Sequence, residues 1–111
     1  MAVPETDLAR IRAFCEARVP PRLRAEARVE ADVRGNRISI FDCRPPWHPN
    51  LTEWSRVPVA QLRYSPTAKA WTLYWADRNG RWNLYDDIAP DQPIQVLIDE
   101  LNDDPTAVFW G

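Results

Sequence analysis

Residues 25–41, AEARVEADVRGNRISIF, contain the pattern that decides the fold. Apolar and charged side chains alternate over the first ten of these residues, as is typical of a strand with one buried face. Gly35-Asn36 is a two-residue hairpin signal that joins this strand to a second. The turn predicts five pairs of facing residues: Val33 with Ile38, Ala31 with Ile40, Asp32 with Ser39, Glu30 with Phe41 and Arg28 with Cys43.

Three further strands are predicted after this hairpin, over residues 57–64, 70–77 and 81–86. Asn79-Gly80 joins the last two, and a two-residue turn there sets Trp75 beside Leu84. The same register sets Asp77 beside Trp82 and Tyr74 beside Tyr85. It gathers on one face the apolar residues that we expect to form the core: Trp71, Leu73, Trp75, Trp82 and Leu84.

Two helices are predicted to flank the strands. The first begins at Thr6 or Asp7 as N-cap and ends at Pro20-Pro21, and the second begins at Asp91 and stops at Pro105. Apolar residues recur at helical spacing in both segments. We therefore expect one α+β domain over residues 1–111. It has an N-terminal helix, a five-stranded antiparallel meander and a C-terminal helix, with both helices packed on one sheet face.

The composition is that of an ordinary globular chain of 111 residues, with 45% apolar and 27% charged residues. No apolar run approaches the roughly 18 residues that cross a bilayer, so we expect no membrane span. The acidic, broken N-terminus does not resemble a signal peptide, which favours a cytoplasmic protein with two reduced thiols, Cys15 and Cys43. We expect no metal site and no cofactor.

Charge is distributed unevenly although the net charge is only −2. Residues 8–37 contain eight arginines and four acids, whereas residues 86–104 contain seven acids and no base. Two explanations are open: the two regions attract each other across the fold, or each binds a different partner.

Several strings carry a family resemblance: RPPWHP at 44–49, PVAQLRY at 58–64, WTLYWADRNGRW at 71–82, YDD at 85–87, and the closing DPT and FWG. They resemble a bacterial family of small proteins known as domain of unknown function 3024. The resemblance extends from about Arg10 to Gly111 and implies a single complete domain. It implies no activity, cofactor or catalytic residue.

Two groups of residues offer catalytic chemistry. Cys43 and His48 would form a thiolate–base pair if the loop brought them within hydrogen-bond reach, although strand-end cysteines more often pack in the core. Asp86 and Asp87, with Asp91 nearby, would bind Mg²⁺ or share acid–base work if they converged. Adjacent strand residues point to opposite faces, which favours a turn and helix cap there instead.

A binding surface is the favoured hypothesis. The polar sheet face is predicted to carry arginines and tyrosines together, and the loop at 44–55 carries two tryptophans and the single histidine. The candidate binding residues are Trp47, His48, Trp54, Arg63, Tyr74, Arg78, Arg81 and Tyr85. Such side chains suit a protein partner or single-stranded nucleic acid, so we expect a non-catalytic binding module.

Three alternatives stand beside this hypothesis. The face could be an ordinary second sheet surface, partly covered by a helix. The chain could be a small metal-independent hydrolase or nuclease, with arginine phosphate clamps and His48 or Tyr85 as proton carrier. It could also form a homodimer through exposed tryptophans and an edge strand.

Overall fold

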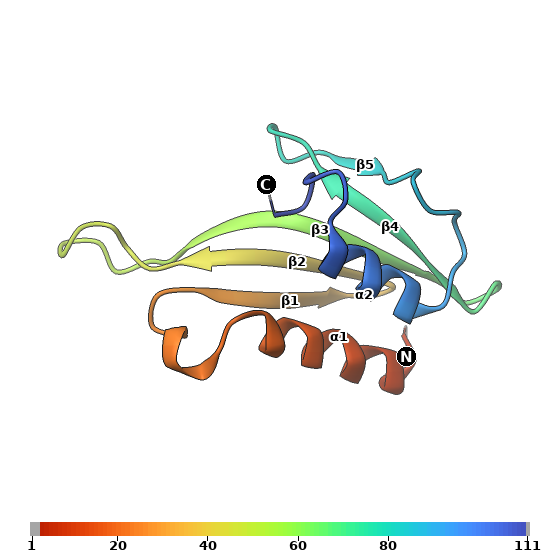
Figure 1. Cartoon of the computed structure of the whole chain (residues 1–111), viewed down its shortest axis with the longest axis horizontal. Coiled ribbons are helices and arrows are strands. Elements are labelled where there is room, and N and C mark those ends of the chain that lie inside the picture. The colour runs from red at the N-terminus through yellow and green to blue at the C-terminus, as the bar shows by residue number, and fades with distance from the viewer. Residues whose placement is uncertain (1–2, 111) are drawn as a thin grey trace.

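The computed structural model describes residues 3–110, which fold into one antiparallel sheet and two α-helices (Figure 1). The strands lie in chain order, β1-β2-β3-β4-β5. The elements are α1 (Glu5–Arg18), the 3₁₀ turn η1 (Pro21–Leu23), β1 (Arg28–Arg34), β2 (Arg37–Arg44), β3 (Ser55–Ser65), β4 (Ala70–Ala76), β5 (Trp82–Leu84) and α2 (Ile94–Asp103). The predicted α+β class and meander are confirmed.

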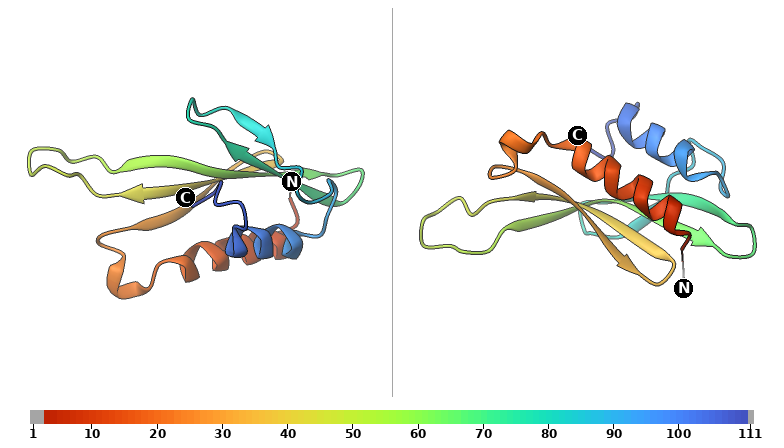
Figure 2. Two further views of the ribbon diagram at one scale, coloured as in Figure 1. Left: turned by 45° about the horizontal axis from the view of Figure 1, so that its top comes forward. Right: turned by 90° about the horizontal axis from the view of Figure 1, so that it is seen from below.

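Both helices lie on the same side of the sheet (Figure 2). Between them and the sheet is a core whose fully buried residues include Trp71, Ile11, Ile38, Ile40, Ala60, Leu62, Leu73, Leu97 and Leu101. No helix formed by residues 3–110 covers the opposite side, which we call the open face. Because strand side chains alternate, every second residue of each strand is directed to the open face.

The first hairpin has the predicted register. Arg34 pairs with Arg37 across a two-residue turn, and all five predicted pairs are present. Gly35 has a φ of +58°, the left-handed conformation that such a turn requires. β1 begins three residues later than predicted, at Arg28, because the backbone N–H groups of Glu26 and Ala27 donate to the Leu23 carbonyl in a tight turn.

The second hairpin differs from the prediction by one residue. Tyr74 pairs with Leu84 rather than with Tyr85, because the turn has three residues instead of two. The Asp77 N–H donates to the Arg81 carbonyl, and the Gly80 N–H donates to the Asp77 carbonyl, each at 2.9 Å. Gly80 supplies the left-handed residue, with a φ of +76°.

This shift moves the side chains of β5 to the other side of the sheet. Trp82 and Leu84, predicted in the core, face the open side, and Leu84 is 49% exposed. Tyr85 is instead buried beneath the helices, where its hydroxyl donates to Glu100 Oε2 at 2.6 Å. Trp71, Leu73 and Trp75 remain on the helix side, as predicted.

A β-bulge interrupts the pairing of β2 with β3. Ile40 pairs with Ala60 and Phe41 with Pro58, which leaves Val59 as the additional residue. Pro58 lies inside the central strand β3, although proline is usual only at strand starts, edges and bulges. The bulge makes this possible, since the regular ladder is already broken where the proline lacks its N–H.

Trp71 joins the sheet to the segments that carry both helices. Its indole Nε1 donates to Asp7 Oδ2 in the first turns of α1 at 2.8 Å. Its backbone forms two hydrogen bonds of 2.8 Å with Gln92, just before α2. The predicted caps at Thr6 or Asp7 and at Asp91 are wrong. Prolines, Pro4 and Pro93, occupy the two N-cap positions.

We expect Trp71→Phe to destabilise the fold by about 2 kcal/mol, because it removes a buried hydrogen bond and part of a close-packed ring. Denaturant unfolding monitored by circular dichroism measures this. Trp47→Phe is the matched control, since its 85% exposed ring should change the unfolding free energy by less than about 0.5 kcal/mol. Equal effects of the two substitutions would contradict the role given to Trp71.

The pKa of the Tyr85 phenol is raised by burial and by its hydrogen bond to Glu100. A raised folded-state pKa means that this stabilisation is present below the unfolded value near pH 10 and is lost above it. We expect Tyr85→Phe to lower the unfolding free energy by about 1 kcal/mol at pH 7. The difference from wild type should shrink between pH 10 and 11.5, and a constant difference would contradict the buried phenol.

Candidate functional site: the open face of the sheet

The open face is richer in positive charge than the rest of the chain. By strand alternation, its charged residues are five arginines and two acids: Arg28, Arg34, Arg37, Arg56, Arg63, Glu30 and Asp32. Its net charge is therefore +3 in a chain of net charge −2, so the remainder carries −5. The charges of this protein are thus separated between surfaces.

Three arginines of the open face lie over aromatic rings. The guanidinium carbon is 4.0 Å from the ring centroid in Arg28 over Trp54 and 4.2 Å in Arg56 over Phe41. It is 3.8 Å in Arg63 over Tyr74. We call these six residues the arginine track. Each pair combines cation–π attraction with a reduced freedom of the arginine side chain.

The arginines of the track are anchored through the same atom. Arg63 Nε donates to Gln61 Oε1 at 2.7 Å, and Gln61 in turn donates to Ser39. Arg28 Nε donates to the carbonyl of Arg24, and Arg56 Nε lies 3.8 Å from Glu30 Oε1. Because each arginine is anchored through Nε, its two terminal amino groups are directed away from the anchor. These are the groups with which an arginine can form a bidentate contact to a carboxylate or phosphate.

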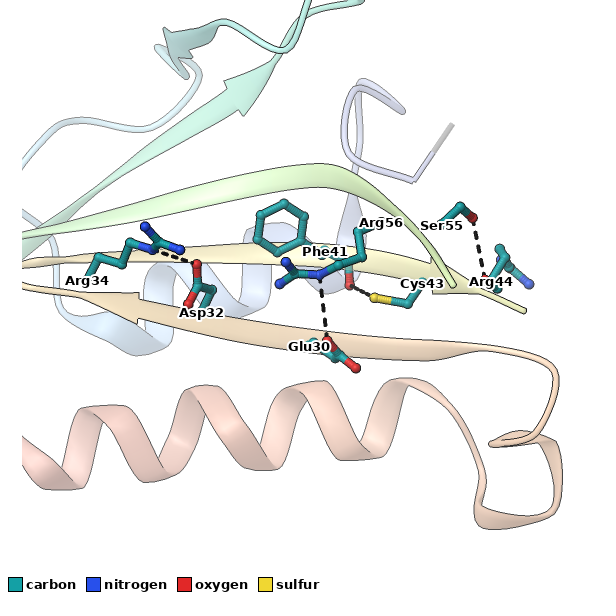
Figure 3. A network of polar contacts seen from close by, with 8 residues as sticks. All are labelled: Glu30, Asp32, Arg34, Phe41, Cys43, Arg44, Ser55 and Arg56. Carbon is teal, nitrogen blue, oxygen red and sulfur yellow. Dashed lines mark hydrogen bonds and ion pairs between the residues drawn. The ribbon is translucent and has the colours of Figure 1, made fainter. Parts of the chain in front are cut away.

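A polar network lies around one end of the track (Figure 3). Arg56 faces Glu30 across the strands, and Asp32 pairs with Arg34 at 3.0 Å. Cys43 is buried beneath this network, with its Sγ 3.9 Å from the Phe41 carbonyl. Burial raises the pKa of the Cys43 thiol and the Glu30 carboxylate raises it further, while Arg56 opposes the shift.

The loop between β2 and β3 projects beyond the helices at one end of the molecule (Figure 1). We call residues 45–54 the arm. Trp47 is 85% exposed, and the ring of His48 lies edge-on at 5.5 Å from it. His48 Nδ1 accepts a hydrogen bond from the Asn50 N–H. Trp54 lies at the base of the arm under Arg28, so the arm continues into the arginine track.

The structure brings together only some of the predicted binding residues. Arg63, Tyr74 and Trp54 belong to the track, and Trp47 and His48 are at the end of the arm. Arg78 and Arg81 are exposed in the β4–β5 turn. Arg78 lines a hollow beside the C-terminal segment 107–110.

The placement of Tyr85 on this face is wrong. The three-residue turn directs it to the helix side, where it is buried against Glu100 and Phe109. Asn83, which pairs with Trp75, is also directed to the helix side. Tyr85 therefore cannot act as a proton carrier beside the arginines of the open face.

Three residues of the track, Arg28, Phe41 and Arg56, are absent from the predicted site. The Gly35-Asn36 register already placed Arg28 and Phe41 on the polar face, which is a signal that could have found them. Arg56 lies opposite Cys43, and that pairing depends on the bulge at Val59. A bulge has no reliable signature in a single sequence, although Pro58 marks its position.

The two catalytic arrangements considered from the sequence are not assembled. Cys43 is buried, whereas His48 is exposed in the arm and bonded to Asn50. Asp86 and Asp87 are exposed in the turn after β5. Within residues 3–110, no group of three or more His, Cys, Asp or Glu side chains is arranged to hold a metal ion.

The fold and this surface define a small α+β protein whose helices cover one side of a sheet and leave an arginine-rich side accessible. The chain belongs to the family described as domain of unknown function (DUF3024), whose model matches residues 2–111. No curated protein and no solved structure matches the chain significantly. No helix within residues 3–110 has the length and apolar character needed to cross a membrane.

Both thiols should be poorly reactive in the folded protein. Burial, with a smaller contribution from Glu16, raises the pKa of Cys15 to about 12, and the pKa of Cys43 is also raised. Because the thiolate is the reactive form, we expect Cys15 to react with a disulfide reagent at pH 8 at least about a hundredfold more slowly than in the unfolded chain. Cys43 should also be slower.

Single-cysteine variants, Cys15→Ala and Cys43→Ala, assign the two rates, and 6 M guanidinium chloride supplies the unfolded reference. Rapid modification of Cys43 in the native protein would contradict its burial. It would also restore the hypothesis of a nucleophilic thiol at the end of β2.

Proposed function

We propose that this protein is a non-catalytic binding module whose open face binds an anionic partner. The observation that carries the proposal is the arginine track: three guanidinium groups, each fixed over a ring within 4.2 Å, on a face of net charge +3. In a chain of net charge −2, such a surface attracts anions only because its charges are separated from the acidic remainder.

The acidic segment 86–104 does not neutralise this surface. Its seven acids take part in none of the three ion pairs found among residues 3–110. Several of them serve the fold instead: Glu100 accepts from Tyr85, and Asp104 accepts from the N–H groups of Phe109 and Trp110. The acids that do pair with open-face arginines, Glu30 and Asp32, are already counted in the net charge of +3, and this excess is available to an external anion.

The ordering of the arginines supports binding with a modest entropic cost. A free arginine loses much rotamer freedom when it binds, whereas a guanidinium already held by a ring and by its Nε has less to lose. Fixed arginines near aromatic rings are also typical of residues that dominate binding energy at interfaces. These features favour recognition of an anionic group over a merely solvated charged face.

The hydrolase alternative lacks support from the positions of its proton carriers. Tyr85 lies on the opposite side of the sheet from the track, and His48 is exposed in the arm, where its ring contacts Trp47 and Asn50. General acid–base catalysis needs the proton carrier within hydrogen-bond reach of the reacting group. Phosphate clamps without such a carrier favour binding over turnover.

Retention on immobilised heparin, used as a generic polyanion, tests the proposal. We expect wild type to be retained at low salt and Arg56→Gln/Arg63→Gln to elute at a clearly lower salt concentration, because two fixed charges of the track are removed. The matched control is Arg12→Gln/Arg22→Gln, which removes the same charge from exposed positions in α1 and η1. It should elute with wild type.

Thermal unfolding of both variants within about 2 °C of wild type would show that the fold is unchanged. The proposal fails if wild type is not retained at low salt. It also fails if the control and track variants shift equally, because retention would then report net charge alone and not this face.

A further inference from the structure

We infer that the anion recognised by the open face is a single-stranded nucleic acid, bound along the arginine track from the base of the arm toward β5. This inference rests on the proposed function and adds the class of partner. Three features carry it: the spacing of the charges, the rings beside them, and the poorer fit of an acidic peptide to the same surface.

The charges of the track are spread over the face rather than gathered at one point. Arg56 and Arg63 are seven residues apart on β3, which corresponds to about 20 Å at the rise of a strand. Arg28 lies two strands away from Arg56 across Cys43, which is about 10 Å at the usual strand separation. These separations are too long for neighbouring phosphates, but one single strand can reach the three arginines with phosphates several nucleotides apart, since small β domains bind about 4–16 nucleotides.

Aromatic rings accompany the charges at both ends of the track. At the β5 end, Trp82 and Leu84 share the open face with Tyr74, and all three have accessible surface. At the other end, Trp54 leads into the arm with its exposed Trp47. Stacking on a ring is open to every base, since each base has a π-face, so these rings suit a single strand whose bases are unpaired.

The arginines add a second mode of stacking. A guanidinium held over a ring can receive a base on its other side, while its terminal amino groups contact a phosphate. Arg63 has this arrangement, with one side on Tyr74 and its Nε bound to Gln61. One side chain thus offers a contact to each chemical part of a nucleotide.

An acidic peptide would use this surface less fully. Carboxylates need the guanidinium edges but give no stacking partner to Trp82 or Trp47. Extended peptides commonly bind by adding a strand to a sheet edge, whereas the track runs across the face of β2 and β3 in the middle of the sheet. A duplex would shield its bases from the rings.

Titrations of intrinsic tryptophan fluorescence with a 12-nucleotide oligothymidylate test the inference. We expect quenching and saturable binding, with log K falling against log salt at a slope of about −2 for three arginine–phosphate contacts. Arg56→Gln/Arg63→Gln should weaken binding at least tenfold, and Arg12→Gln/Arg22→Gln should stay within twofold of wild type. Trp82→Ala should weaken binding about tenfold, and Trp82→Phe should restore most of the loss.

A 12-base-pair duplex, polyglutamate and inorganic polyphosphate serve as competing probes. The inference predicts that oligothymidylate binds more tightly than all three. It is overturned if any of them binds as tightly, or if Trp82→Ala has no effect. In those cases the retention on heparin still decides the proposed function, because that test depends only on the charge of the face.

Discussion

The burial of Trp71 is the interaction on which the arrangement of layers depends. Its ring lies in the core beside Tyr64, with the centroids 5.1 Å apart, while its indole N–H reaches α1 and its backbone pairs with Gln92 ahead of α2. One residue of β4 thereby fixes both helices against the same side of the sheet. A helix on each side would have closed the surface that carries the arginine track.

The contrast between the two sheet faces follows from strand geometry combined with this one-sided covering. Alternation sends Ile38, Ile40 and Leu62 to the helices and their neighbours to water. Arginine can remain on a solvated face while its aliphatic stem covers apolar surface, and here rings such as Tyr74 and Phe41 receive the guanidinium groups. The same alternation that builds the core therefore orders the charges opposite it.

Most of the fold could be predicted from the sequence, because alternation and helical spacing are strong signals over β1, β2 and both helices. The β4–β5 register could not be predicted from Asn79-Gly80 alone, since a three-residue turn also accepts glycine at its last position. Asp77 was the missing signal. Its Oδ1 accepts the N–H groups of Asn79 and Arg81, which stabilises a turn that begins one residue earlier.

The candidate site was partly predictable for the same reason. Residues positioned by the Gly35 turn were assigned to the correct face, whereas Tyr85 was misplaced because a shift of one residue reverses every side chain beyond it. The position of Arg56 depends on the bulge at Val59, which shifts the pairing of β3 with β2 and has no reliable signature in a single sequence.

The prolines of the arm reduce the tendency of the protein to aggregate through strand addition. A projecting hairpin end with a bare indole invites intermolecular strand addition and fibril growth. Pro45, Pro46 and Pro49 lack the amide hydrogen that such an addition needs, and they hold the backbone out of ladder geometry. Trp47 can therefore stay exposed at high protein concentration without the arm offering neighbouring copies a template for polymerisation.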